Sequence, residues 1–401
     1  MNGFMKRAVP MAVFTAGLVL SQSVGAKEIV IGVFASLTGP LAPLGEDMKR
    51  GYALAVKDGG PVNGDTVKLV YEDDQANAVT GLKAAQKLVQ EDGAKVLVGG
   101  TSSAVVLAIA GQATRLNVPI LTTNSQVVQT TGSSCSKYVF RTNRNDAMMA
   151  KGNATLIERT PALAKKKWFI LYHDFVWGKS VKAEFEKIPG LTIVGSASRP
   201  MGTADWSSAI SEIQASGADA IYLGIVIGND MPAFVNQAKS FGLKQVMLPP
   251  LGMPDSMLQT LGDGGVGFTT GALLASWMLE DKIPAMAALN KSYYAEYKVA
   301  PGPEAIQAYV GMQWLLAGLK KSKSLETNAI IASLESTTVP TAIGDLAVRK
   351  EDHQGMVSTY ISQAVKLPTP KYGSAYAWKV LDEVPWSTTK VDLKDTGCAG
   401  L

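Results

Sequence analysis

Apolar and polar positions along this chain follow two periods that succeed each other in a regular order. Short apolar runs such as EIVIGVFA (28–35), VKLVYED (67–73) and KVLVGG (95–100) predict strands. Between them, segments with apolar residues three or four apart, such as 46–58 and 79–92, predict amphipathic helices. Strands separated by helices of this length indicate right-handed βαβ units and therefore an α/β fold with a parallel sheet.

The same alternation begins again after residue 146. Strands are expected at 167–173, 191–196, 219–226 and 245–250, with helices between them. Two successive α/β blocks of roughly 120 residues each fit the usual size of a domain.

The last third of the chain contains no third complete block. Segments 283–299 and 304–322 predict two long helices, and the tail from Gly344 carries polar, strand-like segments. We expect these elements to cover the first block and then the second.

The charge balance excludes some classes of partner. The formal net charge is +4, and Lys6 and Arg7 supply two of these charges. This is too mild for a nucleic-acid-binding protein or a basic membrane patch, so no nucleic-acid or membrane partner is expected. We expect a monomer.

The N-terminus has the composition of a signal peptide. Lys6 and Arg7 precede an apolar run, 8–20, and small residues, Val24 to Ala26, follow it. The run is shorter than the roughly 20 residues that a membrane-spanning helix needs. We expect residues 1–26 to be removed and the mature protein to be periplasmic.

Two cysteines, Cys135 and Cys398, lie in polar, turn-like segments. An even number in an exported protein favours one disulfide that ties down the C-terminus. Two separate thiols remain the alternative.

An open parallel sheet binds ligands at the carboxyl ends of its strands. Six loops take this place in the predicted order: 35–45, 99–104, 122–126, 173–178, 226–230 and 249–255.

The loop GGTSSA (99–104) has the glycines of a phosphate loop but lacks its lysine, so a nucleotide site is disfavoured. Ser102 or Ser103 can instead cap a helix that begins at Ala104, and the free N–H groups there suit a carboxylate. Trp177, placed in a loop after a strand, is a candidate to stack on a ligand.

Catalytic motifs are few. The two histidines, His173 and His353, stand outside any HExxH pattern, and neither CxxC nor GxSxG occurs. Asp73 and Asp74 end a predicted strand, where a capping role is favoured over catalysis or metal binding. No cofactor or metal is expected, and the protein is predicted not to be an enzyme.

Taken in order, several segments resemble a known family. They are IGVFASLTGPLAPLGEDMKRGYALAV, VKLVYEDDQ, GGTSSAVVLAIA, PILTTNSQ, YVFRTNRND, ILYHDFVWG and DAIYLGI. The chain is similar, over nearly all of its mature length, to the periplasmic substrate-binding proteins of ABC importers in the branched-chain amino acid (leucine-binding) class, which have the type I periplasmic binding fold.

The resemblance implies two doubly wound lobes joined by three crossovers that close on a ligand. Lobe one would comprise 27–143 and 276–343, and lobe two 144–275 and 344–401. In the family, the serine that matches Ser103 holds the ligand's α-carboxylate. Asn124 and Gln126 would add polar contacts, and Trp177 would cover the ligand from lobe two.

Four positions depart from the family pattern, the first being Gln126, which stands where the family usually has a threonine. Leu251 stands where amino acid binders have a glutamate that receives the ligand's ammonium. A family tyrosine falls on Val226 or Ile227, and another on Leu44. Burying an ammonium without a carboxylate is costly, so the resemblance with these departures implies a pocket with an anion-binding end and an apolar remainder.

The functional prediction is a periplasmic receptor that delivers a small hydrophobic or aromatic carboxylate to the membrane permease of an ABC importer. Hydrophobic amino acids remain possible if another group accepts the amine. Two alternatives stay open: a secreted enzyme that cleaves a small ester or amide with Asp73 or Asp74, and a ligand carrier for a membrane sensory receptor.

Overall fold

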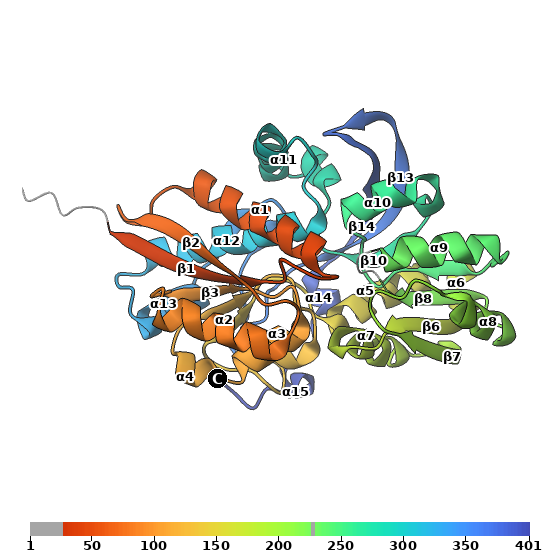
Figure 1. Ribbon diagram of the computed structural model, residues 1–401, viewed down its shortest axis with the longest axis horizontal. Coiled ribbons are helices and arrows are strands. Elements are labelled where there is room, and N and C mark those ends of the chain that lie inside the picture. The colour runs from red at the N-terminus through yellow and green to blue at the C-terminus, as the bar shows by residue number, and fades with distance from the viewer. Residues whose placement is uncertain (1–26, 226–228) are drawn as a thin grey trace, which may run out of the picture.

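A computed structural model describes residues 27–225 and 229–401. It consists of two α/β lobes that lie side by side (Figure 1). The predicted signal peptide, 1–26, and the candidate contacts Val226 and Ile227 lie outside the described residues.

The first lobe is built on a parallel five-stranded sheet with the order β2-β1-β3-β4-β5. Its strands are β1 Glu28–Ala35, β2 Thr66–Asp73, β3 Val96–Gly99, β4 Ile120–Thr122 and β5 Val139–Arg141. The helices that alternate with them are α1 Ala42–Gly59, α2 Ala78–Gln90, α3 Ser103–Ala110 and α4 Ala113–Leu116, with the 3-10 turn η1 Val128–Thr131 before β5. The parallel sheet predicted from the alternation is confirmed.

The second lobe repeats this plan with a parallel four-stranded sheet of order β7-β6-β8-β9. Its strands are β6 Lys167–His173, β7 Thr192–Arg199, β8 Ala220–Gly224 and β9 Val246–Leu248. Its helices are α5 Asp146–Arg159, α6 Pro161–Ala164, α7 Val176–Glu186, α8 Ser207–Ala215, α9 Asp230–Ser240 and α10 Asp255–Leu261, followed by η2 Gly262–Gly265.

The last third of the chain contributes to both lobes. The helices are η3 Trp277–Asp281, α11 Pro284–Tyr297, α12 Pro303–Lys321 and α13 Thr327–Glu335, of which α12 packs along α1 of the first lobe. The strands are β10 Thr269–Leu273, β11 Val339–Thr341, β12 Gly344–Leu346, β13 Thr359–Lys371 and β14 Ser374–Val384. Strands β10, β13 and β14 form an antiparallel sheet against α5 and α10 of the second lobe.

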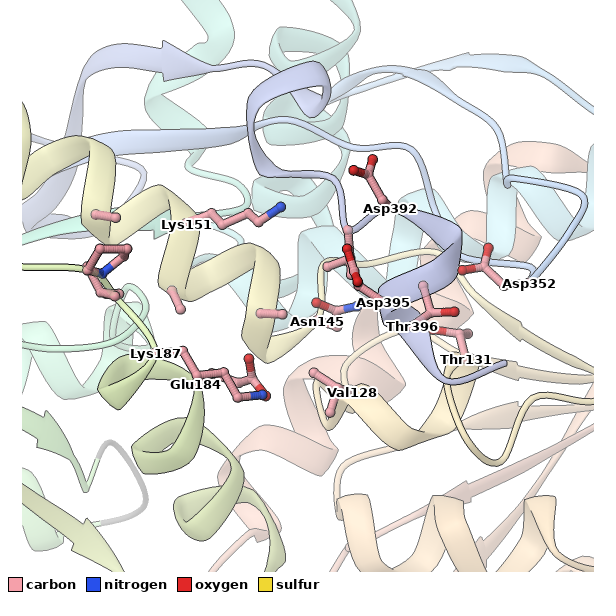
Figure 2. Close-up of a pocket in the computed structure, with 16 residues that line it drawn as sticks. Val128, Thr131, Asn145, Lys151, Glu184, Lys187, Asp352, Asp392, Asp395 and Thr396 are labelled. Carbon is pink, nitrogen blue, oxygen red and sulfur yellow. The ribbon is translucent and has the colours of Figure 1, made fainter. Parts of the chain in front are cut away.

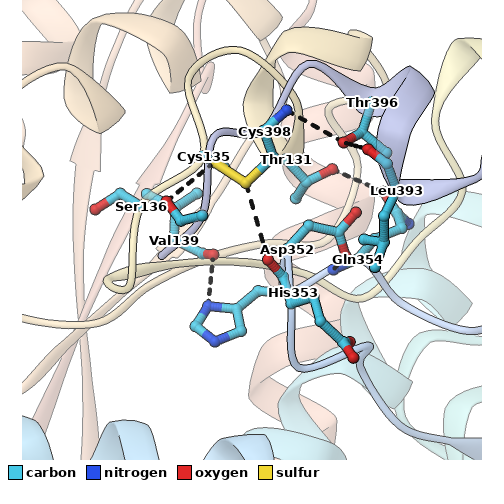
Figure 3. The surroundings of a disulfide bond; sticks show 12 residues. Thr131, Cys135, Ser136, Val139, Asp352, His353, Gln354, Leu393, Thr396 and Cys398 are labelled. Atoms are coloured by element: carbon cyan, nitrogen blue, oxygen red, sulfur yellow. Dashed lines mark hydrogen bonds between the residues drawn. A yellow bond between two sulfur atoms is a disulfide. The ribbon is translucent and has the colours of Figure 1, made fainter.

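The tail beyond β14 returns to the first lobe, where the C-terminus lies in Figure 1. Helix α14, Trp386–Thr389, packs against α5, and α15, Leu393–Thr396, lies against η1. Cys398 is bonded to Cys135, which precedes β5 in the first lobe (Figure 3). The end of segment 344–401, assigned to lobe two by the prediction, therefore also contacts lobe one, because Cys135 belongs to lobe one. The lobe boundaries remain a prediction.

Candidate ligand-binding site

A cavity of about 440 Å³, solvent at its mouth included, lies between the two lobes. Both lobes supply its walls, and α3 of the first contacts α7 of the second. The lining residues are Leu41, Leu44, Thr101, Ser103, Asn124, Gln126 and Glu304 from the first lobe and Phe175, Trp177 and Leu251 from the second.

The two glycines of GGTSSA are explained by close packing. A Cβ on Gly99 would stand 2.0 Å from the carbonyl oxygen of Phe34. Gly100 has a φ of +112°, and a Cβ there would stand 2.2 Å from Thr122 Oγ1. Glycine lets β3 end tightly between β1 and β4, so that the next residues reach the cavity.

Helix α3 begins at Ser103, one residue earlier than predicted. Ser102 takes the N-cap position, but its side chain makes no capping hydrogen bond, so the predicted side-chain cap is wrong. The first helical hydrogen bond runs from the N–H of Val106 to the carbonyl of Ser102, which leaves the N–H groups of 103–105 without a helical acceptor. Ser103 lines the cavity and accepts a hydrogen bond from Ser125 Oγ at 3.1 Å, whereas Ser102 is buried outside the lining.

Arg141 holds the loop after β4 through hydrogen bonds to its backbone. Its Nη1 atom donates to the carbonyl oxygens of Ser125 at 3.1 Å and Val127 at 2.9 Å. Burial lowers the pKa of Arg141 to about 10, so the guanidinium keeps its charge at neutral pH. In the same loop, Gln126 Nε2 donates to Asn124 Oδ1 at 3.3 Å, and both side-chain amides line the cavity.

The second lobe contributes aromatic and aliphatic surface. Trp177 lies in the first turn of α7 rather than in the predicted loop, because the helix begins at Val176 directly after the β6 turn. Its ring centre is 5.9 Å from that of Phe175, and its indole N–H has no hydrogen-bond partner among the described residues. Leu251 follows β9 and is buried in the same wall.

The structure thus brings together five sequence-predicted residues and places Ser102 behind them. The five are Ser103, Asn124, Gln126, Trp177 and Leu251. Leu44, which the sequence analysis aligned with a family tyrosine, lines the cavity as well. Sequence reasoning missed Leu41, Thr101, Phe175 and Glu304. Leu41, Thr101 and Phe175 had a signal, since they stand in the predicted carboxyl-end loops 35–45, 99–104 and 173–178.

Glu304 is the one acidic residue in this lining. It sits in the first turn of α12 and is 2% exposed. Burial, reinforced by the neighbouring Asp47 carboxylate, raises its pKa to about 8. The cavity therefore holds a carboxyl group that is largely uncharged at neutral pH.

The acidic pair at the end of β2, Asp73 and Asp74, holds turns. Asp73 accepts hydrogen bonds from the Leu37 and Gln75 N–H groups and from Thr38 Oγ1. Asp74 accepts from Ser36 Oγ at 2.5 Å and from the N–H of Ala76. Neither lines the cavity, so the capping role that the sequence favoured is the one observed.

A larger cavity, about 1060 Å³ with open solvent included, lies between α5, α7 and the C-terminal tail (Figure 2). Lys187 donates to Glu184 at 2.6 Å, and Lys151 donates to the carbonyl oxygen of Lys390. Its cations are already engaged, and the loops predicted to bind ligand lie elsewhere. We therefore take the smaller cavity as the candidate site.

Within residues 27–225 and 229–401, no group of three or more histidine, cysteine or acidic residues could hold a metal ion. Over the same residues, no helix has the length and apolar character to cross a membrane.

Comparisons with known proteins agree with the fold. The sequence profile of the periplasmic binding protein family matches residues 28–368. A Leu/Ile/Val-binding protein homolog 8 from Brucella abortus is 28% identical over 351 residues, covering 83% of this chain and 84% of the relative.

Two solved structures have the same fold. One is the leucine-, isoleucine-, valine-, threonine- and alanine-binding protein of Brucella ovis in a closed conformation (TM-score 0.79, 22% identity, 92% of this chain and 98% of that one). The other is a solute-binding protein of an R. palustris ABC transporter in complex with benzoate (TM-score 0.78, 22% identity, 89% and 97%). With its two α/β lobes and a profile match over most of its length, the chain belongs to the periplasmic binding protein family.

Proposed function

We propose that this protein is the periplasmic receptor of an ABC importer and binds a small carboxylate with an apolar or aromatic body between its lobes. The observation that carries the proposal is the composition of the interlobe cavity. One wall presents Ser103 and the N-terminus of α3, and the opposite wall presents Phe175, Trp177 and Leu251.

The anion end of the ligand belongs at α3. The free N–H groups of its first turn and the helix dipole both favour a negative charge. The amides of Asn124 and Gln126 stand in the same wall and can donate further hydrogen bonds to carboxylate oxygens.

The body of the ligand belongs against the second lobe. Trp177 and Phe175 offer aromatic faces, and Leu251 offers aliphatic surface. Because each lobe supplies part of the contact, a bound ligand favours the closed arrangement of the lobes. The benzoate complex of one solved neighbour, and the amino acids in the name of the other, support a ligand of this size with a carboxylate.

Binding is tested with the mature protein by thermal shift and calorimetry, using benzoic, 3-phenylpropanoic and 4-methylpentanoic acids. A ligand at 100 times its Kd should stabilise the protein by about 2.7 kcal/mol. Ser103→Ala should weaken binding, and Ser207→Ala, a serine at the start of α8 outside the cavity, should not. Stoichiometric binding without turnover supports a receptor, whereas hydrolysis of a small ester or amide contradicts it.

Delivery to a permease is tested by uptake. Cells that lack this protein should lose accumulation of the bound acid and regain it with the wild-type gene. Normal uptake combined with loss of a behavioural response to the acid would assign the protein to a sensory receptor instead.

A further inference from the structure

Glu304 is a buried acid in the cavity wall that the binding mode above leaves without a role. It is 2% exposed, and its Oε2 atom has no hydrogen-bond partner among the described residues. A buried oxygen of this kind is costly unless a ligand or water satisfies it.

Two further acidic residues lie near Glu304, the partly exposed Asp47 and the buried Asp255. Asp47 comes from α1, and Asp255 begins α10 on the other lobe. Asp47 Oδ2, Glu304 Oε2 and the backbone nitrogen of Asp255 stand 3.2, 3.8 and 3.8 Å from the point that a Cβ on Gly302 would occupy. The carboxyl groups of Asp47 and Glu304 therefore face the same space, which glycine leaves open, and the backbone of Asp255 borders it.

The neighbours of Glu304 already have contacts of their own. Asp255 Oδ2 accepts a hydrogen bond from Trp277 Nε1 at 2.7 Å, and Asp47 Oδ1 lies 3.9 Å from Arg50 Nη1. The buried Arg144 donates its Nε to the carbonyl oxygen of Ala272, while its Nη1 has no hydrogen-bond partner among the described residues. Glu304 is thus the member of this group that lines the cavity with a free oxygen.

The surroundings keep Glu304 protonated near neutral pH. Burial is the largest cause of its raised pKa, about 8, and the Asp47 charge adds to it, while the more weakly coupled Arg144 acts in the other direction. Burial likewise raises the pKa of Asp255 to about 7 and that of Asp47 to about 6. Carboxyl groups packed this closely cannot all be charged, so Glu304 carries an O–H that can donate.

We propose that Glu304 contacts the ligand and donates a hydrogen bond from its carboxyl group to a second oxygen of the acid, so that hydroxy and oxo acids are the preferred ligands. This inference rests on the proposed function, since the ligand's carboxylate is assigned to Ser103 and α3. A ligand ammonium at this place would require Glu304 to lose its proton beside Asp47 and Asp255, whereas an oxygen acceptor leaves the proton where it is.

The preference is tested by calorimetry at pH 7 with ligands that differ only at one carbon. One series is phenylalanine, phenyllactic acid, phenylpyruvic acid and 3-phenylpropanoic acid, and the other is the matching series on the leucine skeleton. In the skeleton that fits, the hydroxy and oxo acids should bind about tenfold more tightly than the unsubstituted acid, and the amino acid most weakly.

The proton is tested by repeating the titration from pH 6.5 to 9.5. Affinity of the wild-type protein for the hydroxy acid should be level to about pH 8 and then fall by up to about tenfold per pH unit. Glu304→Gln keeps a donor that does not titrate, so its affinity should stay level throughout. Glu304→Leu should lose the tenfold preference, and Glu326→Gln, an exposed acid before α13, is the control that should change nothing.

Asp47→Asn and Asp255→Asn each remove a like charge beside Glu304, so the fall in affinity should move to lower pH. If the Glu304 variants fail to fold, the two ligand series and the pH series on the wild-type protein still test whether Glu304 donates a hydrogen bond to the ligand. Tightest binding of an amino acid, with affinity that rises toward pH 8, would assign Glu304 to an ammonium and overturn the inference.

Equal binding of hydroxy and unsubstituted acids, unchanged in Glu304→Gln, would remove Glu304 from the ligand contact while the proposed function stands. Failure of every acid to bind, benzoic acid included, would instead contradict the proposed function.

Discussion

The bond between Cys135 and Cys398 should contribute a large share of the free energy of unfolding. It closes a loop with a sequence separation of 263 residues and is the one link that fixes the C-terminal tail covalently to the first lobe (Figure 3). In the chain-entropy model, closing a loop of this length lowers the entropy of the unfolded chain and so raises the free energy of unfolding by about 5 kcal/mol.

The structure indicates that removing the disulfide will lower the free energy of unfolding by less than the chain-entropy model predicts. In Cys398→Ser the tail keeps its noncovalent contacts, which include the hydrogen bond from Arg349 Nη1 to the carbonyl of Val391 at 2.8 Å and the packing of α15 on η1. Most residues beyond Val391 are exposed, so this part of the tail should fray, and the entropy gained by the native state offsets part of the loss. We expect a loss of about 2–5 kcal/mol.

The assay is guanidinium denaturation of the wild-type protein, Cys135→Ser, Cys398→Ser and the double variant. Both single variants and the double variant should lose the same free energy, because each removes the same bond. Limited proteolysis should cut the variants first within 385–401. Unchanged stability of the variants, or alkylation of both cysteines in the native unreduced protein, would refute this reasoning.

Three further predictions concern the cavity. Leu251→Glu should weaken acid binding in calorimetry, because a polar carboxyl replaces apolar surface; at a pH high enough to ionise it, like charges roughly 10 Å apart at an effective dielectric near 20 add about a tenfold loss. Unchanged affinity would place the ligand elsewhere. Burial raises the pKa of Glu304 from 4.5 to about 8, so the native state holds this proton more tightly than the unfolded chain and stability falls as pH rises from 4.5 to 8. Between pH 4.5 and 7, the free energy of unfolding of Glu304→Gln, measured by chemical denaturation, should therefore rise by about 3 kcal/mol relative to that of the wild-type protein. Parallel pH curves would show that the pKa of Glu304 is not raised in the folded protein. Acid binding should change tryptophan fluorescence in the wild-type protein but not in Trp177→Phe, and an equal change in both would remove Trp177 from the site.

Local patterning predicts most of the elements of the two parallel sheets. The run 28–35 is β1 to the residue, because a strand buried on both faces leaves a continuous apolar run between polar ends. The helix expected to begin at Ala104 is short, since α3 ends at Ala110 and the chain breaks near Gly111 and Gln112 before α4 begins. The pairing of β10 with β13 was not predicted, because segments about 90 residues apart leave no local signal.

The candidate site was predictable where a loop follows a strand of the same lobe. Ser103, Asn124 and Leu251 all stand at the carboxyl ends of parallel strands, so the topology alone brings them toward one edge. Glu304 follows Pro303 at the start of a helix, where an acid is common for reasons of the helix dipole. Only the return of α12 to α1 places its side chain in the cavity, and no local pattern encodes that return.

The central claim, that the interlobe cavity holds a small carboxylate whose body is apolar, is tested most directly by thermal-shift titration of the mature protein with matched acids and amino acids. At least one pair among 3-phenylpropanoic acid and phenylalanine, or 4-methylpentanoic acid and leucine, should show a saturable rise in melting temperature for the acid and a smaller one or none for the amino acid. A strong rise with leucine or phenylalanine while neither these acids nor benzoic acid changes the melting temperature would contradict the account.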